Sequence, residues 1–92
     1  MKKIIDGRKY DTKTATEISH TEWWDDSVNR EQQETLYKKK TGEFFRFDDK
    51  RTTWGDIYDY CRIEPLSIEE AKSWVENHDN VIYEDVFGEV DE

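Results

Sequence analysis

One β-hairpin pattern constrains the fold of this chain more than any other segment. Residues 34–39 and 43–47 are rich in residue types that favour strands. Between them lies Lys40-Thr41-Gly42, in which Gly42 can adopt the positive φ angle of a tight turn. The fold therefore has to contain an antiparallel sheet built around this hairpin.

Two further segments are predicted to be strands. Residues 4–10 carry an Asp6-Gly7 pair between short β-forming stretches, which is typical of a two-residue hairpin turn. Residues 57–63 alternate, so that Ile57, Cys61 and Ile63 share one side, and this pattern indicates a half-buried strand.

The clearest helix signal begins at Ser67. Ser67 and Glu70 have the spacing of a capping box, and Leu66 and Ala71 have that of a hydrophobic staple. The 3–4 spacing that follows predicts an inward stripe made of Ala71, Trp74, Val75 and His78. Residues 81–87 are expected to form one further helical turn that ends at Gly88.

A short helix is also expected near residue 14. Asp11 or Thr12 could cap it, and Thr14 with Glu17 matches a capping box, which would turn Ala15 and Ile18 towards the core. Residues 19–33 are mostly polar and are expected to be loop, and residues 48–55 are expected to be a charged connection.

Composition completes the prediction of the fold class. The 92 residues are enough for one small domain, and four Trp, five Tyr and four Phe can build a core that is poor in leucine. We therefore predict a single α+β domain over residues 1–92. It should contain a small antiparallel sheet of three to five strands and two or three short helices.

The net charge of −9 arises entirely from the last third of the chain. Residues 1–63 contain 13 acidic and 13 basic side chains, whereas residues 64–92 contain ten acidic side chains and a single basic one, Lys72. A clustered anionic surface repels nucleic acid and phospholipid, and it attracts the basic grooves that proteins use to hold nucleic acid.

The sequence contains no recognisable catalytic or metal-binding pattern. His20 and His78 lie far apart, the single Cys61 is expected to be a buried, inert thiol, and no close pairs of zinc ligands occur. Adjacent carboxylates such as Asp25-Asp26 point in different directions on a strand or helix. We therefore expect no enzyme activity, no metal and no cofactor.

Two surface motifs have competing interpretations. Lys38-Lys39-Lys40 with nearby aromatic residues could bind nucleic acid, but a lysine-guarded edge strand is the favoured interpretation. Trp23-Trp24 could either anchor the polar segment to the core or contact a partner, and the sequence favours neither.

Several segments, taken in order, resemble a family of small acidic proteins carried by phages, plasmids and integrative elements, mostly in Gram-positive bacteria. They are residues 7–12, Ala15, Glu17 and Ile18, residues 34–45, Pro65-Leu66-Ser67, Glu70-Ala71-Lys72, Trp74, Tyr83-Glu84 and residues 87–90. Some members of that family are similar to anti-CRISPR proteins. The resemblance implies inhibition of a CRISPR effector, with a Cas9-type effector favoured, in the cytoplasm of a bacterial host.

The functional expectation is a non-enzymatic inhibitor that imitates the charge of nucleic acid and binds a basic protein surface. The alternative is a small structural or regulatory interaction domain with no CRISPR target. We expect no direct binding to nucleic acid and no membrane span, and the beginning of the chain meets charge too soon for a signal peptide. The expected partner-binding residues are Glu69, Glu70, Glu76, Asp79, Glu84, Asp85, Glu89, Trp23 and Trp24.

Overall fold

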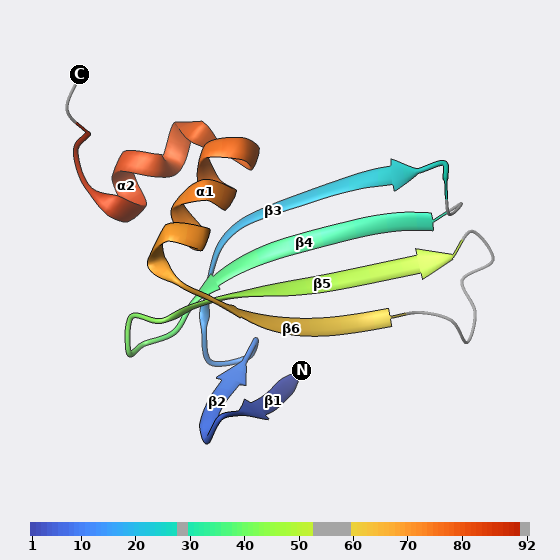
Figure 1. Ribbon diagram of the computed structural model, residues 1–92, viewed down its shortest axis with the longest axis horizontal. Coiled ribbons are helices and arrows are strands. Elements are labelled where there is room, and N and C mark those ends of the chain that lie inside the picture. Colours follow the sequence, from blue (N-terminus) through green and yellow to red (C-terminus); the bar gives the residue numbers. More distant parts are fainter. Residues whose placement is uncertain (28–29, 53–59, 91–92) are drawn as a thin grey trace.

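The computed structural model describes residues 1–27, 30–52 and 60–90. Two sheets and two short α-helices make up an α+β fold that measures 45 × 34 × 18 Å (Figure 1). The elements, in chain order, are β1 (Lys2–Ile5), β2 (Arg8–Asp11), β3 (Thr16–Asp25), β4 (Arg30–Lys38), β5 (Phe44–Thr52), β6 (Tyr60–Leu66), α1 (Ile68–His78), the 3₁₀ turn η1 (Asn80–Ile82) and α2 (Tyr83–Phe87).

Both predicted hairpins are confirmed. β1 and β2 form a two-stranded sheet whose turn has positive φ at Asp6 (52°) and Gly7 (74°), the combination that a tight hairpin turn needs. β4 and β5 pair antiparallel from Lys38↔Phe44 outwards, and Gly42 in their turn has a φ of 94°. The main sheet has the strand order β3-β4-β5-β6, and every neighbouring pair is antiparallel.

The predicted helix near residue 14 is wrong. Asp11 instead begins a tight turn, in which its carbonyl accepts from the amide of Ala15 and its carboxylate accepts from the amide of Lys13. The chain then enters β3, and Ile18 packs against the helix-side core as a strand residue. A side chain that competes for backbone amides favours a turn over a helix, and this competition decides the segment.

The predicted loop over residues 19–33 and the predicted connection from residue 48 are also wrong over the described residues. β3 and β4 run through the first segment, and β5 continues to Thr52. These strand ends lack apolar alternation because neither face of the sheet is covered there (Figure 1). The rest of the predicted connection, residues 53–55, lies outside the described residues.

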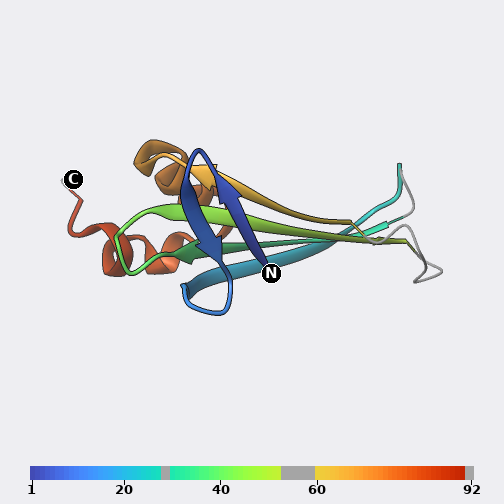
Figure 2. The same ribbon diagram turned by 90° about the horizontal axis from the view of Figure 1, so that it is seen from below.

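The near part of the main sheet, where β4 and β5 meet their turn, is covered on both faces. Leu36 and Phe44 pack against α1, whereas their neighbours Tyr37 and Phe45 face the layer formed by the β1–β2 hairpin. Adjacent strand residues point to opposite faces, so helices and hairpin lie on opposite sides of the sheet (Figure 2). Phe45 is fully buried and contacts the rings of Tyr10 and Tyr37.

The third predicted strand is confirmed in its later half. β6 begins at Tyr60, and Ile57 lies outside the described residues. Ile63 is buried beneath the hairpin layer, but Cys61, on the same face, is exposed. The expectation of a buried thiol is therefore wrong, because the covering layer ends before it reaches Cys61.

The C-terminal helices follow the sequence signals closely. The amide of Glu70 donates to Ser67 Oγ at 3.1 Å, and the amide of Ser67 donates to Glu70 Oε1 at 3.0 Å, which confirms the capping box. Ala71, Trp74 and Val75 are buried, as predicted. His78 is exposed, although its ring lies against the ring of Trp74. α2 ends at Gly88, whose φ is 94°. Over the described residues, no helix is long and apolar enough to cross a membrane.

Candidate functional site

The residues expected to bind a partner fall into two separate groups. The carboxylates lie on α1, α2 and the residues around them, on one face of the near part of the sheet (Figure 1). Trp23 and Trp24 lie at the opposite end of β3, away from the helices. The structure therefore does not bring the predicted site together as one surface.

Two of the predicted carboxylates have structural partners. Glu70 completes the capping box, and its pKa is lowered because the backbone and side chain of Ser67 hydrogen-bond to it. Asp79 ends α1 and accepts a hydrogen bond from Ser19 Oγ at 2.8 Å. Both groups hold the helical layer in place, and this contact with Ser19 could not be read from the sequence.

Five predicted carboxylates remain exposed at the helical end of the molecule. We call them the acidic face: Glu69, Glu76, Glu84, Asp85 and Glu89. Within the part of the chain that the structure describes, none of them makes an ion pair. Lys72 on α1 is the only Lys or Arg of residues 64–92. Its Nζ lies 5.9 Å from the centre of the ring of Phe87 on α2.

A hollow of about 480 Å³ opens on the acidic face. Glu76 from α1 and Glu84 from α2 both line it, together with Asn77, Asn80, Tyr83 and Val90. The 3₁₀ turn η1 joins the two helices, and the two carboxylates on either side of it border the same space. A cationic side chain entering here would meet two carboxylates, two amides and an aromatic ring.

Two carboxylates of the sheet, Asp48 and Glu64, are arranged differently, because they form ion pairs with arginines. Arg46 donates through Nε to Asp48 Oδ1 at 2.7 Å and through Nη2 to Glu64 Oε2 at 2.9 Å. Arg62 adds a second contact to Glu64 at 3.3 Å. Asp48 is buried. The partial burial of Arg46 acts to lower the pKa of its guanidinium, but the hydrogen bond and the charge of Asp48 outweigh this effect, so the pKa of Arg46 is raised.

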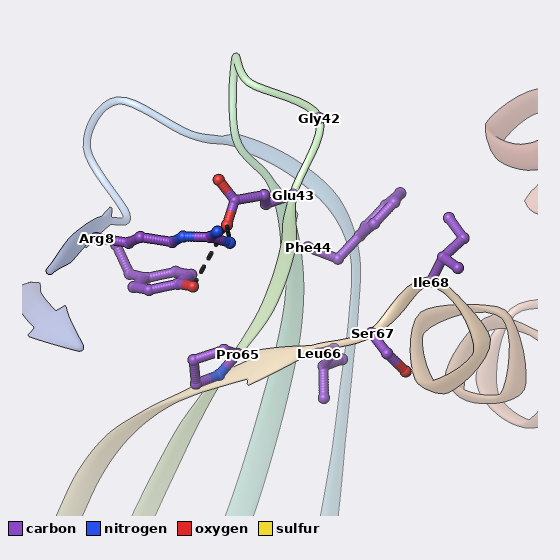
Figure 3. Close-up of a pocket in the computed structure, with 9 residues that line it drawn as sticks. Arg8, Gly42, Glu43, Phe44, Pro65, Leu66, Ser67 and Ile68 are labelled. Atoms are coloured by element: carbon purple, nitrogen blue, oxygen red, sulfur yellow. Dashed lines mark hydrogen bonds and ion pairs between the residues drawn. The ribbon is translucent and has the colours of Figure 1, made fainter. Parts of the chain in front are cut away.

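A second hollow, of about 400 Å³, lies between the β1–β2 hairpin and the start of α1 (Figure 3). Arg8 and Tyr10 from β2 reach Glu43 at 3.1 and 3.5 Å, while Phe44, Leu66 and Ile68 supply apolar walls. Partial desolvation acts to raise the pKa of Glu43. Hydrogen bonds from Lys39, Thr41 and Arg8, with the Lys39 charge, outweigh it and lower that pKa.

The lysine run is not part of an edge strand, so that interpretation is wrong. β4 is an interior strand, with β3 on one side and β5 on the other. The ammonium of Lys39 lies 4.3 Å from the centre of the Tyr10 ring and 3.3 Å from Glu43, and that of Lys38 lies 5.6 Å from the Phe44 ring. These two lysines therefore help to join the hairpin layer and the β4–β5 turn to the sheet.

Trp23 and Trp24 are both partly exposed, at 38% and 46% of their surface. Neither belongs to the two core clusters of the described residues. Trp23 lies opposite Gln32 and Trp24 opposite Glu31 in the β3–β4 register, so the two rings project to opposite faces of an edge strand. Of the two interpretations left open by the sequence, the core interpretation is not supported.

The remaining chemically reactive side chains are dispersed. His20 Nδ1 lies 2.8 Å from Thr35 Oγ1, and the thiol of Cys61 lies 3.8 Å from Asp49 Oδ1. Among the described residues, no group of three or more His, Cys, Asp or Glu side chains is placed to hold a metal ion.

Comparison with known proteins adds no assignment. No protein-family model matches the chain, and neither the curated proteins nor the solved structures contain a match. The class of protein that the fold defines is a small α+β protein with an elongated antiparallel sheet and an acidic helical end.

Proposed function

We propose that this protein is a non-enzymatic inhibitor that binds a basic, nucleic-acid-handling surface of another protein through the acidic face. One observation carries the proposal: five exposed carboxylates on the helical end make no ion pair within the described chain, whereas Asp48 and Glu64 in the sheet and Glu43 in the β4–β5 turn are paired with arginine or lysine.

The energetic argument concerns what the acidic face gains on binding. Exposed carboxylates repel one another, and a partner that supplies lysine or arginine relieves that repulsion and adds attraction. Duplex DNA presents one charge per about 1.7 Å of its axis, so a few carboxylates on one face imitate only a short stretch of it. Complementary charge of this kind acts mainly on the rate of association.

The hollow between α1 and α2 gives the acidic face local shape as well as charge. Glu76 and Glu84 from the two helices border it, and Tyr83 provides an aromatic wall. A guanidinium can pair with a carboxylate and stack on an aromatic ring at the same time. An arginine of the partner is therefore the side chain that fits this hollow best.

The narrower proposal is that the partner is a CRISPR effector, with a Cas9-type effector favoured. The motive is the resemblance of the hairpin and of the Pro65-Leu66-Ser67 helix start to mobile-element proteins that include anti-CRISPR-like members. Effectors of this kind hold a guide–target duplex in a positively charged channel, which is the surface that an anionic inhibitor could occupy.

Two charge-matched variants test the mechanism. Glu76→Lys with Glu84→Lys alters the acidic face, and Glu17→Lys with Asp26→Lys alters two exposed carboxylates elsewhere by the same charge. In a cleavage assay with purified Cas9-type effectors, the first variant should lose inhibition about tenfold or more and the second should change it little. Circular dichroism checks that both fold.

Salt provides an independent check of the same mechanism. Exposed charges interact over only about 8–10 Å at physiological ionic strength, so association should slow as salt increases.

Equal loss of inhibition in the two charge-matched variants would reject the acidic face as the binding surface and would leave net charge as the only cause. A wild-type protein that inhibits no effector would instead favour a small interaction domain with another target.

A further inference from the structure

We infer that the free edge of β3 is a second docking surface, which takes an extended, basic segment of another protein as an added strand. The inference concerns the end of the sheet away from the helices and does not depend on the acidic face. Its evidence is the contrast between the two edges of the main sheet and the position of Trp23 and Trp24 on one of them.

The two edge strands are protected to different degrees. β6 is short, contains Pro65 and Arg62, and leads directly into α1 at Ile68. Proline and basic side chains are common features that prevent a further strand from pairing with an edge. β3 is ten residues long and contains no proline, and the charged side chains that protect it are all acidic, so they would not repel a basic strand. Its one irregularity, between Glu17 and Ser19, lies at the near end of the strand.

The tryptophans lie where an added strand would cover them. They are adjacent, project to opposite faces of β3, and are 38% and 46% exposed. Neither the helices nor the hairpin covers this part of the sheet (Figure 1). A strand paired alongside β3 brings its own side chains to both faces, so it can bury part of both rings at once. Strand addition of this kind combines main-chain hydrogen bonds with side-chain pockets.

Charge selects the partner. Glu17, Glu22 and Asp25 lie on β3, and the side chain of Glu22 is 60% exposed, with one carboxylate oxygen 3.5 Å from His20 Nε2. Pairing with β3 of a second copy would bring six β3 carboxylates into one sheet, and like charges across strands are destabilising. A segment with lysine or arginine at alternate positions instead places positive charge beside Glu22.

The test uses a synthetic peptide of about eight residues that alternates lysine and valine. We expect it to bind with chemical-shift changes confined to β3 and to the indole signals of Trp23 and Trp24. A second peptide with the same side chains but N-methyl groups on alternate amides should bind at least about tenfold more weakly, because it cannot complete the ladder. A glutamate–valine peptide should not bind.

Two variants separate this surface from the acidic face. Replacing Trp23 and Trp24 by serine should weaken peptide binding about tenfold or more, because large aromatic anchors dominate such interfaces. The change should leave the fold intact, because neither ring is in a core cluster. Glu76→Lys with Glu84→Lys should leave peptide binding within about twofold, because those carboxylates lie at the other end of the sheet, beyond the screening length.

Three results would overturn the inference. They are equal binding of the N-methylated peptide, shift changes centred on α1 and α2, and a β3-mediated dimer of the free protein seen by sedimentation. The outcome is independent of the cleavage assay, so a failure of the proposed inhibitor function leaves this test interpretable.

Discussion

The carboxylates of the sheet and those of the helices have similar chemistry but different surroundings. Asp48 is buried against Arg46, and Glu64 contacts both Arg46 and Arg62. Glu76 and Glu84 are exposed and line an open hollow. The difference teaches that formal charge alone does not identify a binding surface, because an acid that an arginine of the same chain already pairs with has less to gain from a partner than an exposed acid that makes no ion pair among the described residues.

The largest effect should come from breaking the junction between the two regions. Trp74 is buried in α1, and its Nε1 donates to Glu34 of β4 at 2.9 Å. Trp74→Ala should lower the free energy of unfolding by about 3–5 kcal/mol through lost packing and the cavity that remains. Urea unfolding followed by circular dichroism measures it, and an unchanged midpoint would show that α1 does not depend on this side chain.

A pair of substitutions tests the comparison itself. Asp48→Ala leaves Arg46 without its principal partner and should cost about 2–3 kcal/mol in unfolding free energy. Glu76→Ala removes an exposed carboxylate and should change the same quantity by no more than about 0.5 kcal/mol. Equal costs for both variants would contradict the distinction between paired and unpaired acids.

Glu70 is, with Asp79, one of two acids of the helical layer that have structural partners, and Ser67→Ala tests its role. The substitution removes the side chain that caps α1, so it should lower the free energy of unfolding by about 0.5–2 kcal/mol. Ser73→Ala, at an exposed position of the same helix, is the matched control and should be close to neutral. A cap that contributed nothing would leave the two variants indistinguishable.

The smallest effect concerns acid pH. The pKa values of Glu43 and Glu70 are lowered below the ordinary value of 4.5, so their contributions to stability are present above that value and are lost as the pH falls through the folded-state pKa. Glu43→Gln and Glu70→Gln should each flatten the fall in unfolding free energy below about pH 4.5. Denaturant melts across this range measure it. Unchanged slopes would show that other carboxyls are responsible.

Local signals allowed part of the fold to be predicted from sequence. The turn at Gly42, the Asp6-Gly7 pair and the capping box at Ser67 each involve residues close together in the chain, and all three are confirmed. The distant strand ends were missed because hydrophobic alternation appears only where a face of the sheet is covered. Residues 20–25 and 30–33 belong to the uncovered part of β3 and β4, so their polar pattern gave no such signal.

The candidate site shows the same division. The concentration of acidic residues after residue 63 is a property of the sequence, so the acidic end of the molecule could be predicted from it. The contact of Asp79 with Ser19 joins residues that are 60 positions apart in the sequence, so it could be found only from the fold. The exposure of Cys61 has the same cause: a strand through residues 60–63 was predicted correctly, but the extent of the covering hairpin layer depends on the fold.

The uncovered far part of the main sheet has a consequence for local opening. Around Leu36 and Phe45 the strands lie between two packed layers, whereas Gln32 and Gln33 belong to neither core cluster of the described residues. Strands held mainly by their own hydrogen bonds open at a lower free energy than strands inside a core. Amide protons in the described chain should therefore exchange with solvent in a gradient along β4, fastest near Gln32 and slowest near Leu36.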